Sequence, residues 1–165
     1  MSSNYIHLGR ETADDWWEIE ALYDLTFAPG RSALSSYRLR EGVAALPDLC
    51  LVARDPARVI AGVVRNWPVR VGGHATVLLG PIAVHPTRQG EGIAAMLMWR
   101  SLEIATQNWD RIMLVGDAPF YQRYGFERLQ NVQMPPPTNP DRVLGLAVTP
   151  GGWDQVLGKV CRIEP

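Results

Sequence analysis

The sequence predicts an α/β protein with a mixed β-sheet and helices on both faces of that sheet. Two hairpins come early: a turn at 54–58 joins two apolar strand patterns, and Gly72-Gly73 closes the next pair. A helical pattern at 93–107 then connects the third of these strands to an apolar run at 112–115. Early hairpins followed by one helical crossover indicate a sheet with both antiparallel and parallel neighbours.

The first quarter of the chain predicts one strand and two helices. Residues 5–8 are expected to form the short strand. Thr12 has the character of a helix N-cap with Asp15 three residues later, and apolar residues follow at helical spacing until Pro29-Gly30 ends the pattern. A second, shorter helix is expected at 34–41.

The remaining part alternates between strand and helix patterns. Pro81 directly follows Gly80 inside a strand pattern, and a proline there indicates an edge position or a bulge. Pro119 suits the first position of a short helix, and the proline-rich segment 134–140 is expected to be a rigid loop. The expected elements are strands at 49–53, 59–67, 76–84, 112–115, 129–133 and 144–148, and helices at 93–107 and 119–124.

Length, charge and cysteine content limit the classes of protein that the chain fits. Its 165 residues are expected to form a single domain, and its formal net charge of -1 lacks the basic excess of a protein that binds nucleic acid or an anionic membrane. Two cysteines are too few for a disulfide scaffold, and no Cys/His cluster has zinc-ligand spacing, so no metal is expected. Without a signal-peptide pattern or a membrane-length apolar run, the chain is expected to be cytoplasmic.

A glycine motif opens the helical pattern at 93–107. It reads Gln-Gly-Glu-Gly-Ile-Ala over residues 89–94 and lies directly after a strand pattern. Bare backbone N–H groups at a helix N-terminus attract anions, so the motif predicts a phosphate site, with simple turn punctuation as the alternative. The dinucleotide fingerprint fails because Ala95 stands where its last glycine belongs, and a P-loop fails because no Lys-Ser/Thr pair follows.

At this point the sequence resembles the GNAT superfamily of N-acetyltransferases, as a small, bacterial-type, single-domain member. Gln89, Gly92 and Ala94 fill the defined positions of its acetyl-CoA motif, Gln/Arg-x-x-Gly-x-Gly/Ala. Residues 121–126 resemble the family's Tyr-x-x-x-Gly-Phe, and the two matches together cover about 77–129. The resemblance implies a mostly antiparallel central sheet that splays like a V between its fourth and fifth strands.

The resemblance also implies acetyl-CoA as co-substrate. Its pantetheine arm would lie in the V and pair with backbone groups of Ile82 and Val84, and its pyrophosphate would bind backbone amides of the glycine motif. Arg88 would either add a charge contact or be a solvated turn residue. The implied cofactor-binding residues are Ile82, Ala83, Val84, Gln89, Gly90, Glu91, Gly92, Ile93, Ala94 and Ala95.

The activity implied is direct transfer of the acetyl group to a primary amine in a ternary complex. Tyr121 would protonate the departing CoA sulfur, with Tyr124 as the less favoured donor, and backbone N–H groups near the kink, such as that of Ile82, would polarise the acetyl carbonyl. Many relatives carry a Glu base on the fourth strand, but residues 76–79 contain none. The candidates for the base are therefore His74, Asp117, Glu20 and water, and those for the acceptor site are Arg31, Tyr37 and Trp67.

Two other functions stay open from the residues. The missing strand carboxylate also fits a non-catalytic acyl-CoA-binding sensor or regulatory module. The small residues Gly80 and Ala83 near the expected acyl end also fit a transferase that uses a longer acyl-CoA. The acceptor is a small-molecule or peptide amine that the sequence does not identify. Homodimers are common in the family, and these residues do not decide whether this chain forms one.

Overall fold

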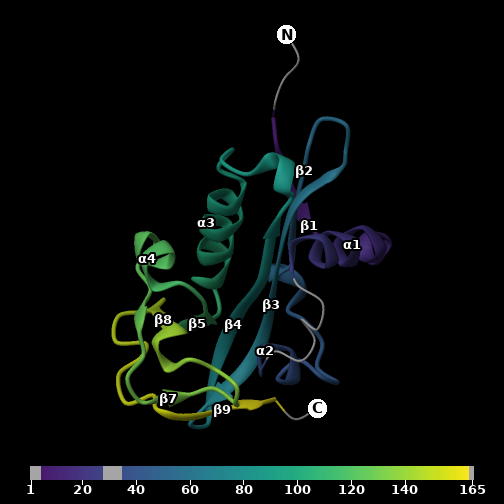
Figure 1. The fold of residues 1–165 in the computed structure, drawn as a ribbon. Coiled ribbons are helices and arrows are strands. Elements are labelled where there is room, and N and C mark those ends of the chain that lie inside the picture. Colours follow the sequence, from purple (N-terminus) through teal and green to yellow (C-terminus); the bar gives the residue numbers. More distant parts are fainter. Residues whose placement is uncertain (1–4, 28–34, 164–165) are drawn as a thin grey trace.

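The computed structural model describes residues 5–27 and 35–163, and a mixed sheet forms its centre (Figure 1). Neighbouring strands follow the order β1-β2-β3-β4-β5-β8-β6, while β9 pairs with β3 and with β7. The pairs β4–β5 and β7–β9 are parallel and the others are antiparallel, which confirms the predicted fold class. The strands are β1 (His7–Arg10), β2 (Leu51–Arg54), β3 (Ile60–Val71), β4 (His74–Val84), β5 (Arg111–Val115), β6 (Glu127–Arg128), β7 (Val132–Gln133), β8 (Val143–Ala147) and β9 (Gly158–Arg162).

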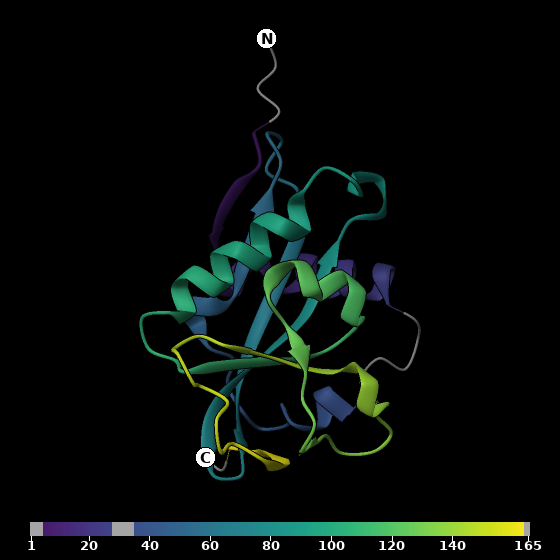
Figure 2. The same ribbon diagram turned by 90° about the vertical axis from the view of Figure 1, so that its left-hand side faces the viewer.

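Helices cover both faces of the sheet, as predicted. Figure 1 shows α1 and α2 on one side of β3 and β4, with α3 and α4 on the other, and Figure 2 views the sheet from the α3 and α4 side. Within 5–27 and 35–163, no helix is long and apolar enough to cross a membrane. The helices are α1 (Trp16–Thr26), α2 (Ser35–Arg38), α3 (Ile93–Ala105) and α4 (Ala118–Tyr121), with 3-10 turns at Ala13–Asp15, Pro47–Leu49, Pro86–Arg88, Gln122–Tyr124 and Pro140–Arg142.

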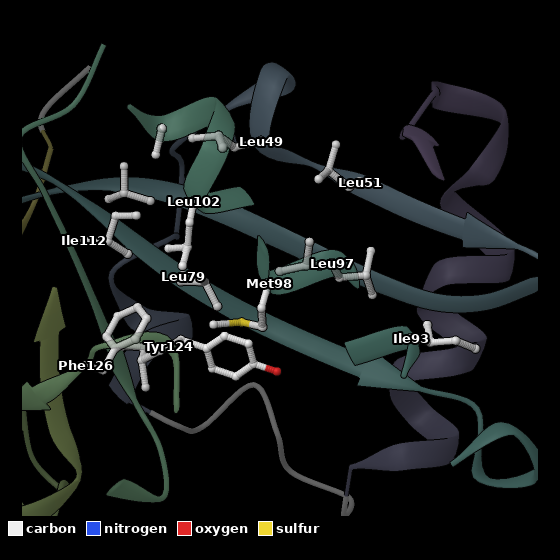
Figure 3. Packing of buried hydrophobic residues seen from close by; sticks show 14 of the residues in the cluster. Leu49, Leu51, Leu79, Ile93, Leu97, Met98, Leu102, Ile112, Tyr124 and Phe126 are labelled. Atoms are coloured by element: carbon white, nitrogen blue, oxygen red, sulfur yellow. The ribbon is translucent and has the colours of Figure 1, made fainter. Parts of the chain in front are cut away.

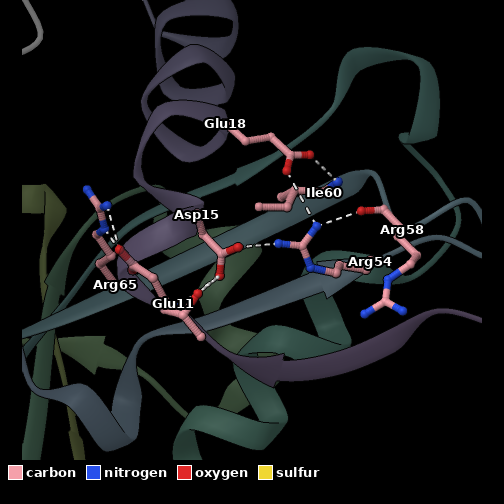
Figure 4. A network of polar contacts seen from close by, with 8 residues as sticks. Glu11, Asp15, Glu18, Arg54, Arg58, Ile60 and Arg65 are labelled. Carbon is pink, nitrogen blue, oxygen red and sulfur yellow. Dashed lines mark hydrogen bonds and ion pairs between the residues drawn. The ribbon is translucent and has the colours of Figure 1, made fainter.

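A capping box starts the first helical segment, as the sequence predicts. The Thr12 backbone N–H donates to the Asp15 carboxylate at 2.9 Å, which satisfies one of the orphan donors of the turn before α1. The same carboxylate forms an ion pair with Arg54 of β2 (Figure 4). Glu18, one turn into the helical segment, accepts a hydrogen bond from the Ile60 backbone N–H of β3 at 2.7 Å. Helix α1 is thereby held to both strands at its beginning.

Helix α3 packs its apolar face onto the sheet. Ile93, Leu97 and Met98 are at most 1% exposed and meet side chains from β2, β4 and β5 (Figure 3). Gly62 of β3 lies directly beneath, where an added Cβ would come within 2.6 Å of the Ile93 side chain and 3.1 Å of the Leu97 side chain. A bare backbone at this position therefore sets how closely the first turns of α3 approach β3.

The observed elements differ from the expected ones in several places. Strand β9 was not predicted, because it buries only Val160 and so lacks a clear apolar alternation. The predicted strand at 129–133 is replaced by the separate short strands β6 and β7. Strand β3 continues to Val71 rather than ending at 67, and α2 ends at Arg38 rather than at 41. Pro29-Gly30 and the predicted start of α2 at 34 lie outside the described residues.

The sheet opens between β4 and β5. The two strands pair only at Val77↔Ile112 and Leu78↔Met113. Beyond Leu78, β4 continues to Val84 beside β3, while β5 keeps its pairing with β8 on its other side. The β4 backbone therefore has an unpaired side beyond this point, and the V-shaped opening agrees with the sequence prediction.

The close approach at Gly62 gives a stability prediction. We expect Gly62→Ala to lower the free energy of unfolding by about 1–3 kcal/mol, because the new methyl group overlaps the Ile93 and Leu97 side chains. Gly9→Ala is the matched control, since Gly9 also lies in a strand and an added Cβ there meets nothing within 4 Å. Urea unfolding of both variants measures the difference, and equal stabilities would contradict this account of helix packing.

Candidate functional site

A bulge lies on β4 at the mouth of the opening. Val64 pairs with Ile82 and Asn66 pairs with Leu79, so Arg65 alone faces the two residues Gly80-Pro81. Gly80 has φ +128°, a conformation that side chains rarely adopt. The Tyr23 hydroxyl of α1 donates to the Pro81 carbonyl at 2.8 Å. The bulge predicted from Pro81 is confirmed, although β4 lies inside the sheet rather than at its edge.

The β4 backbone beyond the bulge points into the opening at alternate residues. The His85 N–H donates to the Ala61 carbonyl at 2.8 Å, so the backbone groups of Ala83, two residues earlier, also face β3. Those of Ile82 and Val84 point the other way, away from β3. Ala83 was predicted with them, but its backbone faces β3 and its side chain is buried.

The glycine motif forms a tight loop between β4 and α3. Gly90 and Gly92 have φ of +83° and +82°, and an added Cβ at either would meet no protein atom within 4 Å. Gly92 is the N-cap of α3, and the Gln89 side-chain amide donates to the Val84 carbonyl at 3.0 Å. No backbone acceptor among the described residues binds the N–H groups of 90–94. The loop therefore presents bare donors and the positive end of a helix dipole to open space.

Arg88 has partners within the protein. Its Nε lies 2.8 Å from the Glu91 carboxylate, and another of its guanidinium nitrogens lies 3.2 Å from Asp55 in the turn between β2 and β3. The hydrogen bond to Glu91 raises the pKa of Arg88. The structure shows a role for Arg88 that was not among the two expected ones: its ion pairs tie the glycine loop to the hairpin between β2 and β3.

A cavity of about 330 Å³ occupies the opening between β4 and β5. Tyr121 of α4 and Ile82 of β4 both line it. The Tyr121 ring packs edge-on against Phe120 at 4.9 Å, and burial raises the pKa of its phenol. Tyr124, the less favoured donor, packs against Trp99 and does not line the cavity. The other lining residues are Phe27, Ser36, Tyr37, Arg40, Leu78, Leu79, Gly80, Pro81, Leu114, Val115, Gly116, Asp117, Phe120 and Arg142.

The cavity reaches both faces of the sheet. Leu79 belongs to the cluster beneath α3, whereas Leu78 belongs to the cluster that contains Leu39, directly after α2. Both line the cavity, with Tyr121 from the α4 side and Tyr37 from the α2 side. Residues from both faces of the sheet therefore meet in the cavity where β4 and β5 part.

The structure separates the other sequence candidates. Asp117 lines the cavity, but His74 is an exposed residue at the start of β4 and does not line it. Glu20 forms an ion pair with Arg65 at 2.9 Å. Of the acceptor-site candidates, Tyr37 lines the cavity, Trp67 does not, and Arg31 lies outside the described residues.

Two arginines of the cavity were missed. Arg40 and Arg142 both line it, and Arg40 is only 9% exposed. Arg40 follows a short polar helix and Arg142 lies in a 3-10 turn, so no sequence motif distinguishes either from the thirteen other arginines of the chain. The two arginines line the same cavity as Tyr121 because β4 and β5 part between them.

Comparison with known proteins identifies the architecture. A family model described as an acetyltransferase (GNAT) domain matches residues 47–128, which include both the glycine loop and Tyr121. The GNAT family N-acetyltransferase YhbS of Escherichia coli, solved in complex with CoA, superposes with a TM-score of 0.82 at 26% identity over 99% of this chain and 93% of its own. No curated protein matched the sequence.

Two further solved structures have the same fold. A GNAT family acetyltransferase from Brucella melitensis in complex with acetyl-CoA has a TM-score of 0.73 at 25% identity, over 97% of each chain. An Arabidopsis thaliana protein, solved with the bisubstrate analogue CoA-Ac-MVNAL, has a TM-score of 0.62 at 15% identity over 86% of this chain and 98% of its own. With its V-shaped sheet, glycine loop and matching domain model, the chain belongs to the GNAT acetyltransferase family.

Proposed function

We propose that the protein transfers an acetyl group from acetyl-CoA to a primary amine by direct attack in a ternary complex. The observation that carries the proposal is the continuity of three features. The glycine loop with its bare amides follows directly after β4, the side of β4 beyond Leu78 is unpaired, and Ile82 of that strand lines the cavity together with Tyr121. Residues 1–165 are proposed to form one N-acetyltransferase domain.

The glycine loop is proposed to hold the pyrophosphate of the donor. Space beside Gly90 and Gly92 is open, and charge-assisted hydrogen bonds from such amides contribute about 1.5–3 kcal/mol each. The pantetheine arm would follow β4, with the outward backbone groups of Ile82 and Val84 as partners. Several such contacts can support micromolar binding, near -8 kcal/mol, after the costs of association. The CoA and acetyl-CoA bound by the two solved relatives support this choice of donor.

Cavity residues supply the groups that acyl transfer needs. The Ile82 N–H, directed away from β3, is proposed to stabilise the oxyanion of the tetrahedral intermediate. Tyr121 would then protonate the CoA thiolate as the thioester C–S bond breaks. An alkyl ammonium with a pKa near 10.4 is neutral in only about one molecule in 10³ at pH 7, so its proton must be removed. Asp117 and solvent water are the acceptors proposed for that proton.

Donor binding is tested at Gly92. We expect Gly92→Ala to raise the Kd for CoA at least about tenfold, or roughly 1.4 kcal/mol, because the methyl group enters the space proposed for the pyrophosphate. Gly73→Ala is the control: its φ of +86° matches the +82° of Gly92, and neither added Cβ meets protein within 4 Å. Both variants should lose a similar roughly 1–3 kcal/mol of stability from backbone strain.

Isothermal titration calorimetry with CoA measures these constants. The control should bind like the parent protein, since Gly73 lies in the hairpin between β3 and β4, at the opposite end of β4 from the glycine loop. If the parent protein bound no CoA at millimolar concentration, the donor assignment would be wrong. If both variants bound equally well, the pyrophosphate would lie elsewhere.

Proton donation is tested by Tyr121→Phe. We expect kcat for release of CoA thiol to fall about 10²–10⁴-fold, while the Kd for CoA stays unchanged. Because burial raises the pKa of the phenol, Tyr121 stays protonated past its usual titration point, so kcat should not fall at alkaline pH below about 10 through this group. Tyr124→Phe removes a phenol outside the cavity and should keep kcat.

An unchanged kcat in Tyr121→Phe would remove Tyr121 from the acid role. CoA binding without thiol release across a broad amine panel would favour the sensor function instead, which the missing carboxylate on 76–79 also fits.

A further inference from the structure

Arg40 differs from the other buried or half-buried arginines of the protein in its partners. Arg65 binds the Glu11 and Glu20 carboxylates at 2.7 and 2.9 Å, and Arg54 binds Asp15 and Glu18 (Figure 4). Arg111, 8% exposed, donates to two backbone carbonyls at 2.6 Å. The described residues give Arg40 no carboxylate partner, although it is only 9% exposed.

The hydrogen bonds of Arg40 leave part of its guanidinium unused. Nε donates to the Ser36 carbonyl at 3.2 Å, and one terminal nitrogen lies 3.4 Å from the Ser36 hydroxyl. A further side-chain hydrogen bond joins Arg40 to Tyr37, so three of the five N–H donors of the guanidinium have partners among the described residues. The planar group lies over the Tyr37 ring at 3.6 Å and 5.5 Å from that of Trp67, so aromatic faces fix it in place.

The pKa of Arg40 reflects its burial without a carboxylate partner among the described residues. Burial lowers the pKa of Arg40, since the energy of desolvation is not offset by an opposite charge. Burial acts in the same direction on Arg65, but its hydrogen bonds to Glu11 and Glu20 outweigh that effect and raise its pKa. A buried cation without a counter-ion costs free energy unless a ligand supplies one.

Arg40 lines the cavity on the face opposite the glycine loop. It comes two residues after α2, the helix that contains Tyr37, whereas Tyr121 belongs to α4 on the other side of the sheet (Figure 1). Of the cavity-lining residues that the structure describes, two carry positive groups, Arg40 and Arg142, and one carries a carboxylate, Asp117. This charge favours an anionic occupant, and a volume of about 330 Å³ suits a small one.

We propose that the amine acceptor carries a carboxylate, and that Arg40 binds this carboxylate from the α2 face of the cavity while the amine points towards Ile82 and Tyr121. The inference rests on the proposed transferase function and names its substrate class: small amino acids or related amino carboxylates. A guanidinium with unused N–H donors forms charge-assisted hydrogen bonds with a carboxylate, which orient the bound molecule as well as holding it. Arg40 is therefore a specificity-determining residue.

Acceptor pairs that differ only in this group test the proposal. Amino acids and their carboxamides serve as acceptors with acetyl-CoA, and CoA thiol release is followed. We expect the parent protein to prefer the acids by at least about tenfold in kcat/KM. Arg40→Gln should abolish that preference mainly through KM, and should leave the carboxamides unaffected. Arg38→Gln changes an exposed residue at the end of α2, two positions before Arg40, and should keep the preference.

Thermal shift measurements with N-acetyl amino acids and their amides, in the presence of CoA, require no turnover. Stabilisation by the acids alone, lost in Arg40→Gln and retained in Arg38→Gln, supports the inference even if no thiol is released. Conversely, turnover of simple amines without a carboxylate-dependent shift would establish the transferase and overturn the inference. The melting temperature and CoA affinity of Arg40→Gln report whether that variant folds, and Arg40→Lys, which keeps the charge, should restore part of the preference if the variant is intact.

A carboxylate could also belong to the acyl group of the donor. Succinyl-CoA and acetyl-CoA are therefore compared with neutral amines as acceptors. Equal sensitivity of the two donors to Arg40→Gln agrees with the acceptor assignment. A selective loss of succinyl transfer would assign the carboxylate to the donor and overturn it.

Discussion

The structure depends on the early end of the pairing between β4 and β5. Two register pairs join these strands, and the Gly80-Pro81 bulge then follows on β4. The bulge is held from the α1 face of the sheet, where the Tyr23 hydroxyl donates a hydrogen bond to the Pro81 carbonyl. This single departure from regular pairing frees alternate backbone groups of β4 and makes room for a cavity inside a continuous sheet. Every group assigned to chemistry or to binding is placed relative to that opening.

Packing on the two faces keeps the opening in a fixed position. On one face, the bare backbone of Gly62 lets α3 lie close to β3, so the glycine loop at its beginning is set against the sheet. On the other face, carboxylates of α1 and its preceding turn bind Arg54 and Arg65 of β2 and β3. Apolar packing therefore positions α3 against β3, and ion pairs position α1 against β2 and β3.

Local patterns in the sequence predict most of this architecture. The Thr12 cap, the Gly72-Gly73 hairpin and the bulge at Pro81 depend on residues that lie close together in the chain, and each is found as expected. Elements that depend on distant partners are different. Strand β9 has one buried residue, and its pairing with β3 rather than its own pattern makes it a strand.

In the candidate site too, the residues of local motifs were predicted and those that depend on distant partners were not. The glycine loop and Tyr121 belong to short motifs, so the sequence brings them to attention. Arg40 carries no motif, and its interest comes from burial, aromatic neighbours and the lack of a carboxylate partner among the described residues. Ala83 shows a finer limit: strand membership was predicted, but the direction of its backbone groups depends on the register with β3.

Pairing between β3 and β9 also affects the order in which the protein can fold. At one end β3 pairs with β2, which precedes it directly, but at Val69–Val71 its other partner is β9, near the far end of the chain. During synthesis that stretch of β3 has an open edge, and its two valines, fully buried in the final structure, lack part of their cover. Such an edge is a site for unwanted association until the last strand arrives. Pairing of β9 with β3 is therefore a late, long-range event in folding, while the hairpins around the opening form from local contacts.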